Sequence, residues 1–70
     1  LTVRHFAKAA GLLRYDLLSL DGQRVLTWEA KARRPGWQEQ QIPLKGLSSG
    51  TYLLRIVDGQ TIQSRKILKN

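Results

Sequence analysis

The side chains that could carry out chemistry are few in this chain of 70 residues. The single histidine, His5, has no cysteine and no second histidine with which to share a metal ion. A lone histidine near the start of a strand is most often a surface or packed residue. Two of the carboxylates, Asp21 and Asp58, each precede a glycine and are explained by turn chemistry. We therefore expect neither a metal ion nor a cofactor.

The remaining carboxylates and the serines do not form a catalytic set. Asp16, Glu29 and Glu39 fall on expected strand surfaces, and nothing in their spacing pairs them as acid and base. The serines lack the glycine-flanked context of a strained nucleophile, and no phosphate-binding glycine loop is present. Since no nucleophile–base constellation can be assembled, we expect no catalytic residue and no enzymatic activity.

The chain is basic, with a formal net charge of +7. Such a surface could bind nucleic acid, anionic lipid or lipopolysaccharide, or it could simply keep the protein soluble and protect strand edges. The scattered positions of the basic residues favour the second interpretation. Trp28 and Trp37 flank Arg33 and Arg34, and aromatic rings beside arginines can stack on bases or sugars. Alternatively, Trp28 lies in the core against Tyr15, and Trp37 caps the sheet.

The elements that position these residues are expected to be β-strands. Apolar and polar residues alternate over short windows that are separated by turn residues, which is typical of strands. The expected strands are residues 1–6, 12–20, 23–30, 37–44, 51–57 and 60–68. Pro43 lacks a backbone donor, so it places the end of the fourth strand at an edge or irregularity. Six short strands with antiparallel hairpins predict a β-sandwich or a small barrel.

The dipeptide Asp-Gly occurs twice between strands, and side-chain pairing predicts which loop each copy makes. A two-residue loop at Asp21-Gly22 places only apolar residues opposite one another on one face. The resulting pairs are Leu17–Leu26, Tyr15–Trp28 and Leu13–Ala30. At Asp58-Gly59 the same loop would pair apolar with polar residues. A three-residue loop, residues 57–59, is expected there instead.

In that second hairpin, the expected register sets Leu54 opposite Ile62 and Tyr52 opposite Ser64, and Gly59 takes the left-handed bulge position. We therefore expect different loops from the same dipeptide. The predicted core consists of Tyr15, Leu17, Leu26, Trp28, Leu54 and Ile56.

Three segments resemble those of the type A C-terminal sorting domains of the type IX (Por) secretion system. Residues 15–26 look like the family's hairpin with a short glycine turn, a basic residue and a valine. Residues 42–56 resemble its segment Leu–x–x–Leu–x–x–Gly–x–Tyr followed by apolar and basic positions, and residues 64–69 resemble its terminal strand. The turn and structural positions are Asp21, Gly22, Leu44, Leu47, Asp58 and Gly59. The recognition positions are Gly50, Tyr52, Arg65, Lys66, Ile67, Leu68 and Lys69.

The resemblance implies an immunoglobulin-like antiparallel β-sandwich of about six to seven short strands. It implies a signal that targets an N-terminally fused cargo protein to an outer-membrane translocon, followed by removal of the signal by a sortase-like peptidase. Anionic lipopolysaccharide is a further implied partner, and nucleic acid is not. The protein would cross the periplasm and reach the cell surface or the medium. Family members usually begin with an Asn-Pro segment, so this single domain, residues 1–70, is expected to lack that first segment.

Two other interpretations stay open. The chain could be a basic module that binds glycan or nucleic acid through exposed aromatic rings, such as Trp37 with Tyr52. It could also be a fibronectin-like accessory domain of a secreted protein. For the sorting signal, we expect the recognised surface on the closing hairpin, residues 50–70, because Lys66 and Lys69 need no role in the core.

Overall fold

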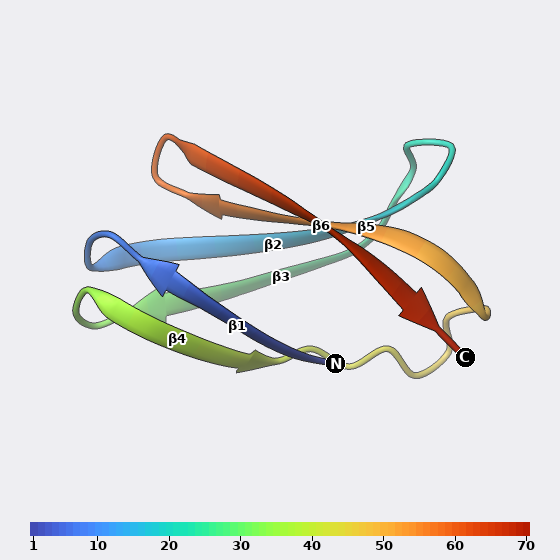
Figure 1. The fold of residues 1–70 in the computed structure, drawn as a ribbon, viewed down its shortest axis with the longest axis horizontal. Coiled ribbons are helices and arrows are strands. Elements are labelled where there is room, and N and C mark those ends of the chain that lie inside the picture. Colours follow the sequence, from blue (N-terminus) through green and yellow to red (C-terminus); the bar gives the residue numbers. More distant parts are fainter.

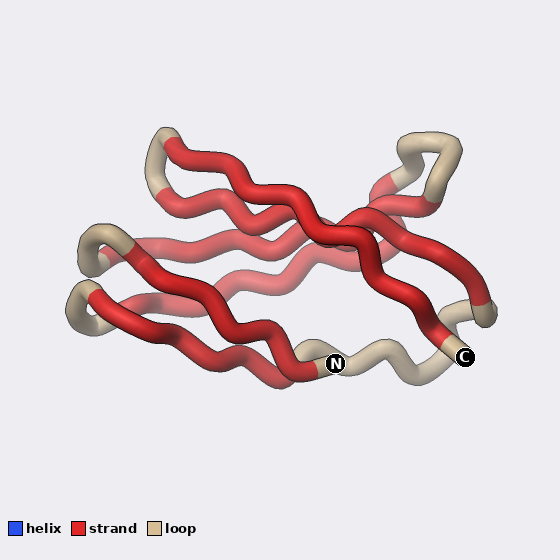
Figure 2. The backbone as a smooth tube through the Cα atoms, in the orientation of Figure 1, coloured by secondary structure: helices blue, strands red, loops and turns tan.

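The protein, described over residues 1–70 by a computed structural model, is an antiparallel β-sandwich (Figure 1). Figure 2 shows that strands, loops and turns make up the whole backbone, so no helix could span a membrane. The strands are β1 (Thr2–Ala7), β2 (Gly11–Ser19), β3 (Arg24–Ala32), β4 (Gly36–Gln41), β5 (Gly50–Asp58) and β6 (Thr61–Lys69). The all-β prediction is confirmed, at the lower end of the expected strand count.

The two sheets differ in size. β1 and β4 form a two-stranded sheet, and the larger sheet has the order β3-β2-β5-β6. The hairpins β2–β3 and β5–β6 stay within the large sheet, whereas the other connections cross between the sheets. β6 is hydrogen-bonded to β5 alone, so it is an edge strand. The small sheet faces only part of the large one, because two strands cannot cover four.

Alternate residues of β1, β2 and β5 fill the space between the sheets. The buried apolar residues are Val3, Ala7, Leu13, Tyr15, Leu17, Ala32, Ile42, Tyr52, Leu54 and Ile56. This set confirms the predicted core positions on β2 and β5. The two predicted positions on β3, Leu26 and Trp28, are only half-buried, although both pack against the core. Trp28 faces β4, where its indole N–H donates to Gln40 Oε1 at 3.3 Å.

The β2–β3 hairpin has the predicted apolar pairs but not the predicted loop. Its loop spans residues 20–22: the Ser19 carbonyl accepts from the Gly22 N–H at 3.0 Å, and the Ser19 N–H donates to the Gln23 carbonyl at 2.8 Å. Gly22, with φ +91°, takes the left-handed bulge position of a three-residue loop. A register shift that leaves Val25 without a partner then restores the predicted pairing.

The β5–β6 hairpin differs from the prediction in both loop and register. Its loop is the pair Gly59 and Gln60, with φ +60° at Gly59, the pattern of a type II′ turn. Leu54 therefore lies opposite Arg65, and not opposite Ile62. The prediction assumed that β6 is buried on its inner face. That face extends beyond the small sheet, so polar side chains are tolerated there. The two Asp-Gly loops thus differ as expected, but each has the length predicted for the other.

Candidate recognition surface

Five of the motif residues singled out in the sequence meet at one corner of the sandwich, where the β4–β5 loop passes the end of β6 (Figure 1). We call it the closing corner; it consists of Leu44, Leu47, Tyr52, Ile67 and Lys69. The three aliphatic side chains pack against the buried core. Their spacing in the sequence motif is thus explained by the need to anchor a loop that crosses from one sheet to the other.

Hydrogen bonds complete the closing corner. The Tyr52 hydroxyl donates to the Ser48 carbonyl at 2.5 Å, which is the tyrosine-corner arrangement known from immunoglobulin-like sandwiches. The Lys69 ammonium donates to the Leu47 carbonyl. Gly50 begins β5 with φ +146°, which only glycine adopts readily. The sequence argument gave Lys69 no role in the core; the structure gives it a role outside the core, because its ammonium holds the loop.

The terminal strand divides the remaining motif residues between its two faces. Arg65 lies opposite Leu54 on the inner side, and its guanidinium donates to Gln63 Oε1 at 3.2 Å. Lys66 and Leu68 point outward, and Leu68 is 70% exposed. Two side chains of the terminal motif are thus free to contact a partner, and both lie beside the open backbone edge of β6.

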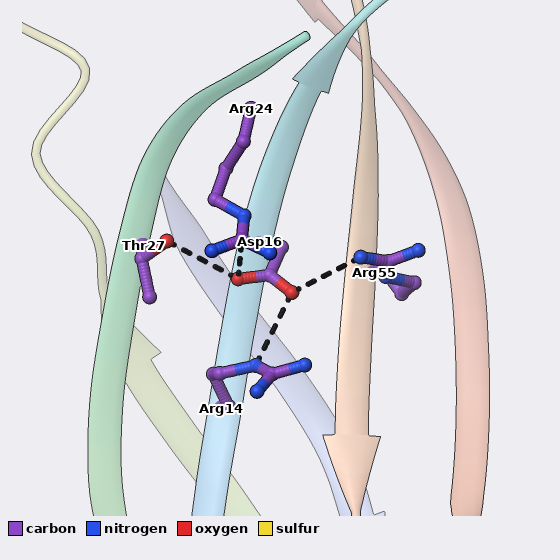
Figure 3. A network of polar contacts seen from close by, with 5 residues as sticks. All are labelled: Arg14, Asp16, Arg24, Thr27 and Arg55. Carbon is purple, nitrogen blue, oxygen red and sulfur yellow. Dashed lines mark hydrogen bonds and ion pairs between the residues drawn. The ribbon is translucent and has the colours of Figure 1, made fainter. Parts of the chain in front are cut away.

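Asp16 is the residue whose environment the sequence missed. It was expected on a strand surface, but its side chain is 0% exposed, although it lies on the outer face of β2. Its Oδ2 accepts from Arg14 Nε at 3.2 Å and from Arg55 Nη2 at 3.3 Å (Figure 3). Its Oδ1 lies 3.8 Å from Arg24 Nε and accepts from the Thr27 hydroxyl at 3.3 Å. Asp16 is therefore buried beneath side chains and not between sheets.

Part of this cluster could be predicted from the sequence. Arg14 and Asp16 are two residues apart on one strand and so share a face. The predicted β2–β3 register sets Thr27 opposite Asp16, as observed. Arg55 is different, because its position depends on the pairing of β2 with β5. These two strands are not joined by a hairpin, so the sequence gives no local signal for their register.

His5 is packed between the sheets. Of the two expectations for it, a surface residue or a packed one, the second is confirmed. Its Nε2 lies 2.7 Å from the Tyr15 hydroxyl. Burial is the main cause that lowers the pKa of His5; Arg65 adds to it, and Asp58 opposes it. Burial, with Asp58, raises the pKa of Tyr15. A hollow of about 140 Å³ borders His5. No group of three or more His, Cys, Asp and Glu side chains that could hold a metal ion is present.

Aromatic rings are exposed only on the outer face of the small sheet. Trp37, 70% exposed, meets Phe6 edge to face with ring centroids 5.8 Å apart. Tyr52 is buried on the inner face of β5, so the considered platform of Trp37 with Tyr52 does not exist. Beside the rings, Arg4 and Glu39 form an ion pair of 2.9 Å, which balances the charge of this face.

Comparison with known proteins gives one match. A family model described as the secretion system C-terminal sorting domain matches residues 2–70. Searches of curated proteins and of solved structures gave no significant match. The matched range includes the closing corner, the Asp16 cluster and the whole of β6.

Proposed function

Because the chain belongs to the family of secretion system C-terminal sorting domains, we propose that β6 is the part of it that the type IX machinery reads. The family sets the coarse function: the domain is a C-terminal sorting signal for type IX export of a cargo protein. Such export leads across the outer membrane to the cell surface or the medium. The family is not a catalytic one.

The single observation that carries the proposal is the open edge of β6. This strand is hydrogen-bonded on one side only, and unpaired backbone groups of an edge strand can accept a strand from a partner. Lys66 and Leu68 stand exposed beside that edge, whereas Tyr52, Ile67 and Lys69 are occupied in holding the closing corner. Lys66 also discourages unspecific edge pairing, so it favours one partner over many.

The finer partners follow from this role. An outer-membrane translocon recognises β6, and it receives the folded signal after transit through the periplasm. A sortase-like peptidase then removes the signal from an N-terminally fused cargo, and the cargo passes to anionic lipopolysaccharide. A compact sandwich suits this route, because a folded signal presents one fixed surface throughout.

The test is export of a periplasmic reporter fused in front of this chain, in a host with a type IX system. Lys66→Glu should reduce the exported fraction at least tenfold. The matched control is Lys45→Glu, an equal charge change at an exposed lysine of the β4–β5 loop, and it should export like the parent. Thermal melts must show that both variants fold normally. Normal export of a folded Lys66→Glu variant would move recognition away from β6, and failure of the parent fusion would contradict the sorting role itself.

A further inference from the structure

The outer face of the large sheet holds arginines whose hydrogen-bonding capacity is largely unused. Arg14, Arg24 and Arg55 approach the one carboxylate of Asp16 from three sides (Figure 3). Each turns one nitrogen toward it, although a guanidinium carries five N–H donors. The Arg55 Nε is buried and has no partner. One negative charge therefore orients three positive ones and leaves most of their donors free.

The surroundings of the cluster add positive charge and apolar surface. By strand register, the basic residues of this face are Arg14, Arg24, Lys31, Arg55 and Lys66, and the acidic ones are Asp16 and Glu29. Its exposed aliphatic residues are Leu12, Leu53, Ile62 and Leu68. Neither hollow of the molecule lies here: one is lined mainly by β1 and the β5–β6 hairpin, the other by Arg4 and Trp37. A face without a pocket that mixes arginine with aliphatic side chains suits a protein surface better than a small ligand.

We propose that the outer face of the large sheet docks onto an acidic surface of a protein of the secretion machinery, whose carboxylates accept hydrogen bonds from Arg14, Arg24 and Arg55. The inference rests on the proposed function for its setting. It extends the recognised surface from the edge of β6, whose Lys66 and Leu68 belong to the same face, to the arginine cluster on β2, β3 and β5. The planar guanidinium matches a carboxylate with two parallel hydrogen bonds, which a lysine cannot do. Asp16 holds the arginines in place beforehand, so less side-chain freedom is lost on binding.

The experiment compares two double variants in the reporter-export assay. Arg14→Gln with Arg24→Gln removes two guanidinium groups and leaves Arg55 on Asp16. Arg4→Gln with Arg33→Gln removes the same charge from exposed positions outside this face. We expect the first variant to lose at least tenfold in export and the second to match the parent. If the first variant melts well below the parent, Arg24→Gln alone replaces it, because Arg24 makes the longest ion pair and is 54% exposed.

The outcomes separate the two proposals. If the parent and the control are exported and the folded Arg14/Arg24 variant is exported equally well, docking through this face is overturned while the sorting function stands. If the parent itself is not exported, the proposed function fails. Flotation with phosphatidylglycerol vesicles tests the other source of anions: we expect no association, and association that depends on Arg14 and Arg24 would overturn a protein partner in favour of a membrane.

Discussion

Tyr15 and Asp16 are neighbours on β2, and both are fully buried, but on opposite faces of the large sheet. Tyr15 is covered by the second sheet, with His5 against its hydroxyl. Asp16 is covered only by side chains that reach over it from its own strand and its two neighbours. The inner face is therefore closed by the packing of elements, whereas the outer face is closed by long charged side chains that still reach solvent. The first arrangement serves folding, and the second can serve folding and recognition together.

The largest expected effect tests this contrast on one strand with one residue type. Leu54 points inward and is 1% exposed, and Leu53 points outward and is 38% exposed. Leu54→Ala should lower the free energy of unfolding by about 2–5 kcal/mol, because it removes buried methyl groups and leaves a cavity. Leu53→Ala should cost less than about 1 kcal/mol, since it leaves no enclosed cavity. Urea denaturation measures both. Equal losses would show that the two faces are not distinct in energy.

The sequence predicted most of this contrast on the inner face and little of it on the outer face. Alternation alone identified all six strands, although the fourth ends at Gln41, before Pro43, and not at residue 44. It also identified Tyr15, Leu17, Leu54 and Ile56 as core. Alternation works there because one buried face imposes a period of two.

The length of the β2–β3 loop, the β5–β6 register and the burial of Asp16 were not predicted from the sequence, and each has a physical reason. The longer β2–β3 loop, made at Asp21-Gly22, was invisible because a bulge farther along restored the same apolar pairs. The β5–β6 register failed because three inward positions of β6, Thr61, Gln63 and Arg65, are polar and not buried. The burial of Asp16 needed Arg55, a residue brought close only by the pairing of β2 with β5.

A smaller loss is expected when the outer face is disturbed. Asp16→Asn keeps the size of the side chain but removes the charge that holds three arginines together. We expect a decrease of about 1–3 kcal/mol in the free energy of unfolding, in the range of hydrogen bonds to charged groups. Glu39→Gln, which weakens a single exposed ion pair with Arg4, should cost under about 1 kcal/mol. Similar values for the two variants in urea denaturation would mean that Asp16 is no more than an ordinary surface partner.

Between pH 7.5 and 5.5, a pH dependence of stability should arise from His5 on the inner face. Burial between the sheets, with Arg65 nearby, lowers the pKa of His5 from its ordinary value of 6.5, against the opposing effect of Asp58. The unfolded chain therefore binds a proton more readily, so stability is complete above pH 6.5 and declines as the pH falls below it. Melts at pH 7.5 and 5.5 should show the decline in the parent.

The control for this prediction is His5→Gln, which keeps a polar side chain opposite the Tyr15 hydroxyl but cannot titrate. Its stability should change much less between pH 7.5 and 5.5. Asp21, whose pKa is lowered by its hydrogen bonds with Ser19 and the Gln23 N–H, loses its contribution only as the pH falls below about 4, outside this window. An undiminished decline in His5→Gln would assign the pH dependence to another group.

The smallest expected effect concerns nucleic acid, which a chain of net charge +7 could bind without specificity. Binding of single strands needs both a basic groove and aromatic rings on which bases stack. This molecule separates the two: the arginine cluster lies on the outer face of the large sheet, and Phe6 and Trp37 lie on the outer face of the small one. Titration with labelled single-stranded DNA at physiological salt should therefore show no saturable binding. Submicromolar affinity that is lost on Arg14→Gln with Arg24→Gln would show that the outer face reads phosphates, and would replace the acidic protein surface with a nucleic acid as its partner.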